Sequence, residues 1–385
     1  MKYYLLTFLL FVQYCVVAQD FFAIDTFFSE KVEQKQLAGA ITLVARNSEV
    51  RHFRSYGFMD IEQSLPIDKN ALIPIASMTK LMTSIGILIL QEEGKLNIDE
   101  PVENYLPQFR HLKVYIKPEE PKTEKLATKP TVRHLLNHTS GFAYGGKNYD
   151  EAGFKEWNRP LSEFIDKITA IPLAFQAGTN WKYSYSHDIL GYLIEKVSGV
   201  TLDRFLKERL FIPLGMNDTD FYVPEEKSDQ QSDLYLYKNG SLEKIDLMGC
   251  SAYRCLPVAI SGGGGWYDSY GGIVSTVSDF YMLANWLLNN DYLENTNILS
   301  SNSLKMMISN QIGELMAGHY KYGLGVGVIE VNNGETKEIF WAGSPYNTYF
   351  WINYEKREIG ILFTNTAPYG HLNMMTKFRE LVDEI

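Results

Sequence analysis

Segments with the pattern of β-strands lie at both ends of this chain, and the long stretch between them is mainly helical. Near the start, residues 40–44 and 50–56 have the pattern of two strands joined by a turn at Asn47 and Ser48. Four more strand patterns follow near the end, over residues 322–331, 338–342, 346–354 and 358–365. Strands from both termini predict one sheet that both ends of the chain build, with a helical insertion between them.

The helical signals are strongest in one central segment. Residues 78–90 are apolar on nearly every side, which predicts a buried helix that ends at Gly94. Asn239-Gly240 lies in the middle of residues 234–245 and predicts a local β-hairpin. Thr276 and Asp279 have the spacing of a capping box at a helix start. We also expect helices over residues 22–37, 132–136, 162–169, 189–197, 202–210, 280–288 and 371–384, and a solvated loop over 113–130.

The first residues have the layout of a secretory signal peptide. Lys2 supplies one positive charge, residues 3–14 are apolar and uncharged, and Ala18 precedes Gln19. The apolar run is short for a membrane span of about 20 residues, and an uncleaved N-terminal anchor is the alternative. We therefore expect a signal peptide over residues 1–18, with cleavage near Ala18 and export to the periplasm or the medium.

The remaining residues 19–385 are expected to form a single domain without a transmembrane span. Its sheet region would comprise about residues 19–60 and 312–385, and its helical region about residues 61–311. Hydrophobic residues make up 45% of the chain, enough for a core and too many for a disordered protein. The net charge of −10 argues against a nucleic-acid partner. Cys250 and Cys255 either pair across a short loop or remain free thiols, and both readings stay open.

Several common catalytic motifs are missing from the sequence. There is no Gly-x-Ser-x-Gly of the α/β-hydrolase type and no phosphate-binding P-loop. His134 and His138 are four residues apart, but Leu135 follows the first, so the zinc-protease pattern His-Glu-x-x-His fails. We expect neither a metal ion nor an organic cofactor.

Ser-x-x-Lys occurs twice, at Ser77–Lys80 and at Ser241–Lys244. Ser241 follows the predicted hairpin turn, where a solvated lysine needs no further role. Ser77 opens the predicted buried helix, where positions i and i+3 share a face, so Lys80 can reach the serine hydroxyl. Desolvation and the helix N-terminus should lower the pKa of Lys80, which would let it take the proton of Ser77. The alternative is a structural role for both residues, with Ser77 as a helix cap and Lys80 as a surface residue.

Further motifs follow in order along the chain, over residues 39–57, 75–80, 94–107, 131–141, 183–199, 213–216, 271–276 and 322–325. On these segments the chain resembles the serine β-lactamase and penicillin-binding superfamily, in particular class C β-lactamase-like esterases and D,D-peptidases. The resemblance covers about residues 25–380 and implies an α/β (α+β) sandwich. Its antiparallel sheet would be flanked by terminal helices, with the active site where the sheet meets a mostly helical region.

The second motif of this superfamily, Tyr-x-Asn, falls on Tyr183-Ser184-Tyr185. The resemblance implies that Tyr183 carries the proton between Ser77 and the leaving group. Tyr185 stands where the asparagine holds the amide side chain of a β-lactam, and its presence there weakens the β-lactamase interpretation. The adjacent Ser186-His187-Asp188 are not expected to form a triad, because neighbouring residues at a helix start point in different directions. The turn at residues 138–141 is expected to be structural.

The third motif, Lys-Thr-Gly, falls on Trp341-Ala342-Gly343, followed by Ser344. No cation stands at its first position, and Trp-x-Gly resembles the esterase branch. The resemblance implies an oxyanion hole made by the backbone N–H groups of Ser77 and Ser344. Trp341 would line the pocket, or alternatively be a core aromatic residue. Gly343 would let the substrate approach closely.

The sequence therefore predicts an exported serine hydrolase that cleaves an ester or amide through a covalent acyl-serine intermediate. A β-lactamase-like esterase is favoured, with Ser77, Lys80 and Tyr183 as catalytic residues and a small ester, amide or peptide as substrate. The alternatives are a D,D-carboxypeptidase or penicillin-binding protein, a weak β-lactamase, or a non-catalytic scaffold on the same fold. The acyl group, the leaving group and the oligomeric state cannot be inferred from the sequence.

Overall fold

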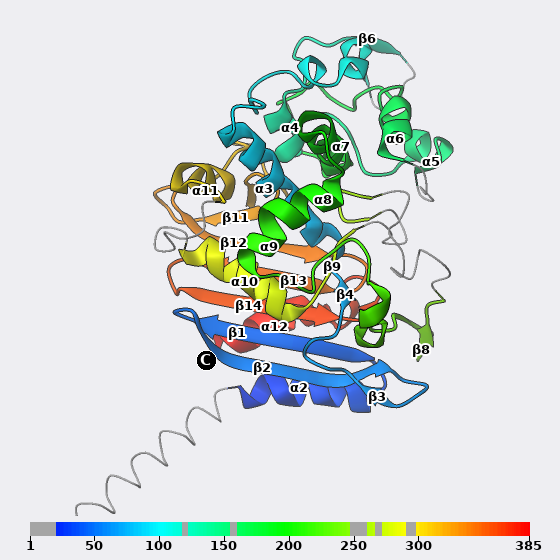
Figure 1. The fold of residues 1–385 in the computed structure, drawn as a ribbon, viewed down its shortest axis with the longest axis vertical. Coiled ribbons are helices and arrows are strands. Elements are labelled where there is room, and N and C mark those ends of the chain that lie inside the picture. Colours follow the sequence, from blue (N-terminus) through cyan, green and yellow to red (C-terminus); the bar gives the residue numbers. More distant parts are fainter. Residues whose placement is uncertain (1–20, 118–121, 155–159, 247–259, 266–271, 290–297) are drawn as a thin grey trace, which may run out of the picture.

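The computed structural model describes residues 21–117, 122–154, 160–246, 260–265, 272–289 and 298–385. Within them, eight antiparallel strands form one sheet in the order β10-β11-β12-β13-β14-β1-β2-β3. β1 pairs with β14 along its length, so the two ends of the chain meet at the middle of the sheet, as predicted (Figure 1). The N-terminal strands are β1 (Gly39–Arg46), β2 (Glu49–Asp60) and β3 (Leu65–Pro66). The C-terminal strands are β10 (Lys321–Tyr322), β11 (Gly327–Glu330), β12 (Thr336–Gly343), β13 (Thr348–Asn353) and β14 (Glu358–Thr364).

Residues 322–331 differ from the prediction, because they form a hairpin and not one strand. The chain reverses at Gly325, whose φ of +88° suits glycine, and the Gly323 N–H donates to the Val326 carbonyl. The predicted hairpin at Asn239-Gly240 is confirmed and joins β7 (Tyr235–Lys238) to β8 (Ser241–Lys244). The expected loop at 113–130 contains two short paired strands, β5 (Lys113–Tyr115) and β6 (Thr123–Lys125).

Helices cover both faces of the sheet, because its strands place apolar side chains alternately on one face and on the other. Leu362 of β14 packs with α2 (Phe22–Glu33) and α12 (Met374–Asp383) on one face. Its neighbour Phe363 meets Phe280 of α10 (Val277–Asn289) on the other face. Helices therefore flank the sheet as predicted, although α2 ends at Glu33 and not at residue 37.

The helical region centres on α3 (Thr79–Glu92), in which every residue from Thr79 to Leu90 is buried. This confirms the predicted buried helix, and Gly94 follows it with a φ of +68°. The expected capping box at α10 is half formed: Thr276 accepts the Asp279 N–H at 3.1 Å, but the Asp279 carboxylate binds elsewhere. The other helices are α4 (Val132–Leu136), α5 (Lys147–Glu151), α6 (Leu161–Ile168), α7 (Ser186–Ser198), α8 (Leu202–Leu206), α9 (Ile212–Leu214) and α11 (Ser301–Ile308).

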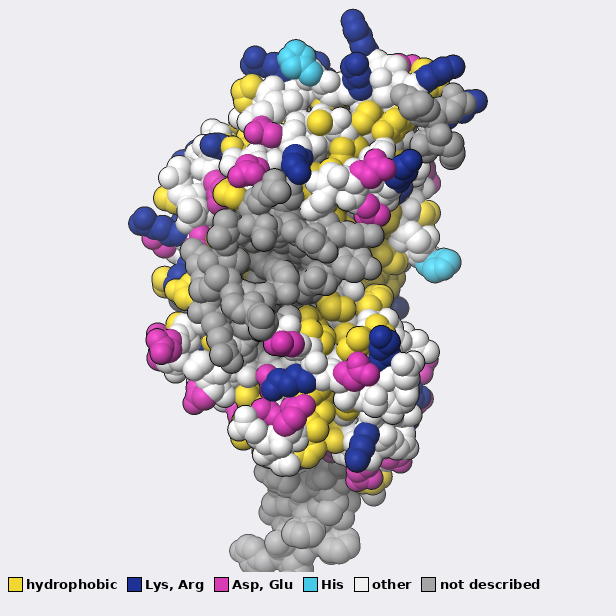
Figure 2. All heavy atoms as spheres, turned by 90° about the vertical axis from the view of Figure 1, so that its right-hand side faces the viewer, with side chains coloured by type: hydrophobic (Ala, Val, Ile, Leu, Met, Phe, Trp, Pro, Cys, Tyr) yellow, Lys and Arg dark blue, Asp and Glu magenta, His cyan; other side chains and the backbone are white. Residues whose placement is uncertain are grey.

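The predicted signal peptide, Cys250 and Cys255 lie outside the described residues. Within the described ranges, none of the helices has the length and apolar character needed to cross a membrane. Figure 2 shows acidic and basic side chains interspersed over one face, without an extended basic patch among the coloured residues.

Candidate active site

Ser77 lies in a single 3₁₀ turn, Ala76–Met78, that leads directly into α3. The strand β4 (Ile73–Pro74) pairs with β9 (Val274–Ser275) and fixes the approach to this turn. Ala76 has a φ of +46°, which is unfavourable for a residue with a Cβ atom. Gly264 packs against this peptide so closely that a Cβ there would overlap the Ala76 carbonyl oxygen. The backbone is therefore strained just before Ser77, as is common at functional sites.

Lys80 lies one turn after Ser77 and is fully buried. Its ammonium Nζ is 3.4 Å from the Ser77 hydroxyl and donates a hydrogen bond to the Gly263 carbonyl. Burial lowers the pKa of Lys80 to about 8, and the charge of Asp188 opposes part of that shift. The alternative of a solvated surface lysine is therefore wrong.

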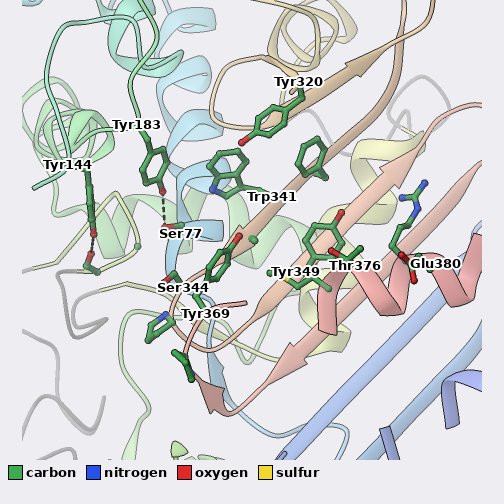
Figure 3. A pocket seen from close by; sticks show the side chains of 18 residues that line it. Ser77, Tyr144, Tyr183, Tyr320, Trp341, Ser344, Tyr349, Tyr369, Thr376 and Glu380 are labelled. Carbon is green, nitrogen blue, oxygen red and sulfur yellow. Dashed lines mark hydrogen bonds between the residues drawn. The ribbon is translucent and has the colours of Figure 1, made fainter. Parts of the chain in front are cut away.

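Tyr183 completes the group around the serine. Its phenol donates a hydrogen bond to the Ser77 hydroxyl at 2.8 Å (Figure 3). The Lys80 ammonium lies 4.6 Å from the centre of the Tyr183 ring. Burial raises the pKa of Tyr183 well above its usual value, so this side chain remains a neutral phenol. A neutral phenol can pass a proton between a hydroxyl and an amine.

The sequence analysis named Asp188 only to exclude a triad and gave it no place in the site. Asp188 lies on α7 and is fully buried. Its Oδ1 accepts hydrogen bonds from the Ser261 hydroxyl at 2.6 Å and the Gly263 N–H at 3.3 Å. Gly263 is the residue whose carbonyl binds Lys80, so Asp188 holds the peptide that holds the lysine. Burial raises the pKa of Asp188 to about 6. Because α7 also contains Glu195 and Lys196, an acidic residue on this helix was not by itself a signal that could have found Asp188.

The neighbours of Asp188 confirm that residues 186–188 do not form a triad. Ser186 lies 2.9 Å from the hydroxyl of Ser140, and His187 Nε2 lies 3.0 Å from the hydroxyl of Ser84. These three side chains thus have separate partners, as expected for adjacent helical residues. His138 is likewise buried, with its ring 4.8 Å from that of Tyr183, which fits the structural role expected for its turn.

A cavity of about 930 Å³ opens at Ser77 and extends along the sheet to α12. Ser77 and Tyr183 lie at one end, and Thr376 and Glu380 lie at the other (Figure 3). Aromatic side chains dominate its walls, which favours a ligand with apolar groups. These aromatic residues are Tyr144, Tyr183, Tyr320, Phe340, Trp341, Tyr349 and Tyr369.

The residues of the third motif differ in whether they line the cavity. Trp341 and Ser344 line the cavity, and the Trp341 ring lies 5.7 Å from that of Tyr183. No described residue accepts a hydrogen bond from the Ser77 N–H, so that donor can meet a substrate. The explanation for Gly343 needs correction: a Cβ there would overlap the Ile75 carbonyl oxygen, so glycine allows β12 to approach the segment before Ser77.

The structure does not bring Tyr185 to the cavity as expected. Tyr185 is buried and stacks on Tyr144, with ring centres 4.4 Å apart. It packs among Tyr149, Phe154 and Phe164 and is absent from the cavity lining. The tyrosine at this motif position therefore serves the aromatic core beside the site, and the predicted substrate contact is not supported.

One group of acidic side chains in the described ranges is close enough to share a cation. The carboxylates of Asp60, Glu62 and Asp233 approach within 4.8 Å of one another. Lys244 already lies among them, with its ammonium 2.5 Å from Asp233. None of these residues lines the cavity at Ser77.

Comparison with known proteins adds independent evidence. The family model described as Beta-lactamase matches residues 24–383. Esterase EstB of Burkholderia gladioli is 32% identical over 215 residues, covering 52% of each protein. Penicillin-binding protein 4* of Bacillus subtilis is 29% identical over 224 residues, covering 56% of this chain and 45% of that protein. The solved structure of EstCE1, titled a hydrolase with promiscuous acyltransferase activity, has a TM-score of 0.79 at 21% identity and covers 95% of this chain and 98% of its own.

Proposed function

The chain belongs to the β-lactamase family and is a serine hydrolase, and on this basis we propose that it is an esterase acting on uncharged carboxylic esters. The observation that carries the proposal is the contact of Ser77 with both Tyr183 and Lys80 at the mouth of an aromatic cavity. This geometry suits a nucleophile with two groups that share its proton.

In the proposed mechanism, the Ser77 oxygen attacks the ester carbonyl carbon. The hydroxyl proton passes through the Tyr183 phenol towards neutral Lys80, and the negative carbonyl oxygen binds the N–H groups of Ser77 and Ser344. The carbon–oxygen bond of the ester then breaks, and the leaving alcohol receives the proton. Water then attacks the acyl carbon and gives up one proton to Lys80 and Tyr183. The bond between the acyl carbon and the Ser77 oxygen breaks, that oxygen receives the proton from Tyr183, and the acid is released. A Lys80 pKa of about 8 leaves part of the lysine neutral near pH 7.

The charges around the cavity favour uncharged substrates over β-lactams and peptides. Trp341 occupies the position at which a cation would meet a substrate carboxylate. Among the described lining residues, Arg379 is the one cation, and it is already bound to Glu338 at 2.7 Å and Asp383 at 2.9 Å. The Arg379 Nη1 has no hydrogen-bond partner among the described residues, but two carboxylates already balance its charge, so a substrate carboxylate there would be a third negative group around one cation. The D,D-peptidase and β-lactamase interpretations need a cation that binds the substrate carboxylate, and among the described lining residues only the charge-balanced Arg379 could supply it.

The first test compares a short p-nitrophenyl ester with a chromogenic cephalosporin, using the chain from Gln19 onward. The Ser77→Ala variant is the negative control, and Ser241→Ala is the matched variant at the second Ser-x-x-Lys. We expect ester turnover that Ser77→Ala abolishes and Ser241→Ala preserves, with little cephalosporin turnover. Faster cephalosporin turnover would favour the β-lactamase interpretation. Stoichiometric labelling of Ser77 by penicillin would favour a D,D-peptidase, and unchanged properties of Ser77→Ala would favour a scaffold.

We also propose that the protein is exported after cleavage near Ala18. The support is the charge at Lys2, the apolar run after it and the small residue before Gln19. Expression of the full chain in a bacterial host, followed by cell fractionation and intact-mass measurement, tests this. A mature protein in the extracytoplasmic fraction that begins near Gln19 is expected, and a full-length cytoplasmic protein would contradict export.

A further inference from the structure

The cavity is much longer than the chemistry at Ser77 requires. Its volume of about 930 Å³ lies at the upper end of the range of about 300–1,000 Å³ for sites that hold drug-sized molecules. A short ester would occupy only the end near Ser77 and Tyr183. The remainder, which we call the distal arm, passes Ser344 and Tyr369 and ends at α12 (Figure 3). Phe340, Ala342, Tyr349, Met375, Thr376, Arg379 and Glu380 line it.

The register of two strands creates the floor of the distal arm. Ala342 of β12 lies directly opposite Tyr349 of β13, and Phe340 precedes Ala342 by two residues. Residues two apart on a strand share a face, so Phe340, Ala342 and Tyr349 lie on the same side of the sheet. The small Ala342 leaves room between the two aromatic rings. Met375 of α12 adds a flexible thioether to the wall, which adapts well to ring-shaped ligands.

The polar groups of the distal arm are mostly occupied by the protein itself. The Arg379 guanidinium binds Glu338 and Asp383 and lies 4.6 Å from the centre of the Trp351 ring. The Glu380 carboxylate lies 3.4 Å from the Lys377 ammonium. Arg379, the one cation among the described lining residues, is thus balanced by two carboxylates, although its Nη1 has no hydrogen-bond partner there. The rest of the arm is largely aromatic and apolar surface, which suits an uncharged group.

We propose that the distal arm is a binding subsite for an uncharged aromatic or polycyclic group carried by the ester substrate. The proposal rests on the proposed esterase function, because the group must be joined to the carbonyl that Ser77 attacks. Flat rings fit between aromatic walls and bury their faces on Phe340 and Tyr349. The natural substrate class is then a bulky aryl or fused-ring ester.

The test places a larger side chain in the distal arm and compares kcat/KM for naphthyl esters with kcat/KM for p-nitrophenyl acetate. Met375→Trp places a larger side chain in the arm, and Met282→Trp is the matched control, because Met282 is exposed on α10 and does not line the cavity. The substrates are p-nitrophenyl acetate, p-nitrophenyl 2-naphthylacetate for the acyl side, and 2-naphthyl acetate for the alcohol side. We expect at least one naphthyl ester to exceed p-nitrophenyl acetate in kcat/KM by about tenfold or more.

Met375→Trp should remove that advantage, so that kcat/KM for the preferred naphthyl ester falls to about that for p-nitrophenyl acetate in the same variant, whereas Met282→Trp should leave both values unchanged. Tyr349→Ala should raise KM for the preferred naphthyl ester. No preference for either naphthyl ester, or the same preference in Met375→Trp as in the wild type, would overturn the subsite. Loss of acetate turnover in Met375→Trp would also overturn it, provided that thermal unfolding is unchanged.

A binding measurement separates this proposal from the esterase proposal. The Ser77→Ala variant keeps the cavity but lacks the nucleophile, so it can be titrated with p-nitrophenyl 2-naphthylacetate and 2-naphthyl acetate by fluorescence. When Met375→Trp is added to Ser77→Ala, the naphthyl ester that binds more tightly should lose about tenfold in affinity. Equal binding with and without Met375→Trp would overturn the subsite. Ester hydrolysis that survives Ser77→Ala would instead overturn the proposed mechanism. The binding measurement would still decide whether the distal arm is a subsite.

Discussion

The same four-residue pattern, Ser-x-x-Lys, occupies two very different environments in this protein. At the start of α3, Lys80 is fully buried, and its ammonium approaches the Ser77 hydroxyl at 3.4 Å. On the exposed hairpin strand β8, the Lys244 ammonium lies 2.5 Å from Asp233, and the Ser241 hydroxyl donates to the Lys238 carbonyl. The pair meets on the helix and separates on the strand, because i and i+3 share a helical face but lie on opposite faces of a strand.

The two environments also shift the lysine pKa in opposite directions. Burial lowers the pKa of Lys80 to about 8, whereas the hydrogen bond to Asp233 raises the pKa of Lys244. A lysine can act as a base near pH 7 only when its neutral form is accessible. The comparison teaches that the secondary structure around the motif and its burial, and not its four residues, decide whether it has chemistry.

The two Ser-x-x-Lys motifs should differ most in the loss of kcat when the serine of each is replaced by alanine. Ser77→Ala should lower kcat for ester hydrolysis by on the order of 10⁵-fold, because the nucleophile is gone. Ser241→Ala should leave kcat within about twofold, because its hydroxyl contacts only a local carbonyl. Steady-state kinetics with p-nitrophenyl acetate measure both variants. Comparable losses in the two variants would remove the distinction between the sites.

Replacement of each lysine by methionine should give the next largest contrast. Lys80→Met keeps the apolar volume but removes the base, so kcat should fall by about 10²–10⁴-fold. Circular dichroism should show a stability equal to or above that of the wild type, because a buried amine is replaced by an apolar group. Lys244→Met should leave kcat unchanged. A large loss in Lys244→Met, or none in Lys80→Met, would contradict the assignment of the base.

The pH profile follows from the direction of the Lys80 shift. The lysine accepts a proton only when neutral, so kcat/KM should rise with pH and level off above about pH 8. Lysine with an unshifted pKa would place that limb near pH 10.4. Rates measured over this range in one buffer system of constant ionic strength test the point. A rate that falls as pH rises through 8 would mean that the ammonium form is required.

Asp188→Asn should give a smaller and more specific effect. The Asp188 charge raises the pKa of Lys80, so its removal should move the rising limb of the pH profile to lower pH. The Gly263 peptide also loses a charged acceptor, and kcat should fall by about tenfold. Asp279→Asn is the matched control, because burial raises the pKa of this α10 carboxyl group as well. The Asp279 carboxylate binds the Thr219 hydroxyl and does not contact Gly263 or Lys80 in the described residues. Only Asp188→Asn should shift the profile.

Local structure was predictable because its signals lie close together in the sequence. The buried helix, its end at Gly94 and the hairpin at Asn239-Gly240 each depend on a few neighbouring residues. The hairpin between β10 and β11 was missed because apolar residues continue through it and only the glycines mark the reversal. Tyr183 lies 106 residues from Ser77, so its place in the site came from the family resemblance and not from local pattern.

The parts of the site that the sequence did not reveal depend on contacts between distant segments. Asp188 reaches Lys80 through the Gly263 peptide, and neither spacing nor periodicity relates those three residues. The distal arm depends on the pairing of Ala342 with Tyr349 and on the later return of α12, so no single motif contains it. A pattern can identify the type of residue that performs chemistry, but the tertiary fold decides which neighbours tune it.

The smallest expected effect concerns the stability of the hairpin. Lys244 lies among Asp60, Glu62 and Asp233, so Lys244→Met should leave three carboxylates facing one another. The Lys244 side chain is 40% exposed, and solvent screens its interactions, so the loss in the free energy of unfolding should be about 1 kcal/mol or less. Urea unfolding at low and at high salt measures it.

High salt should shrink that loss, because dissolved ions screen the repulsion between the carboxylates that remain. Lys377→Met is the control, since Glu380 is its one ion-pair partner among the described residues and no acidic cluster remains there. A loss that is independent of salt would mean that the aliphatic part of Lys244 packs against the hairpin and that charge contributes little. In either case esterase activity should stay unchanged, because the buried Lys80, and not the exposed Lys244, faces a serine that a substrate can reach.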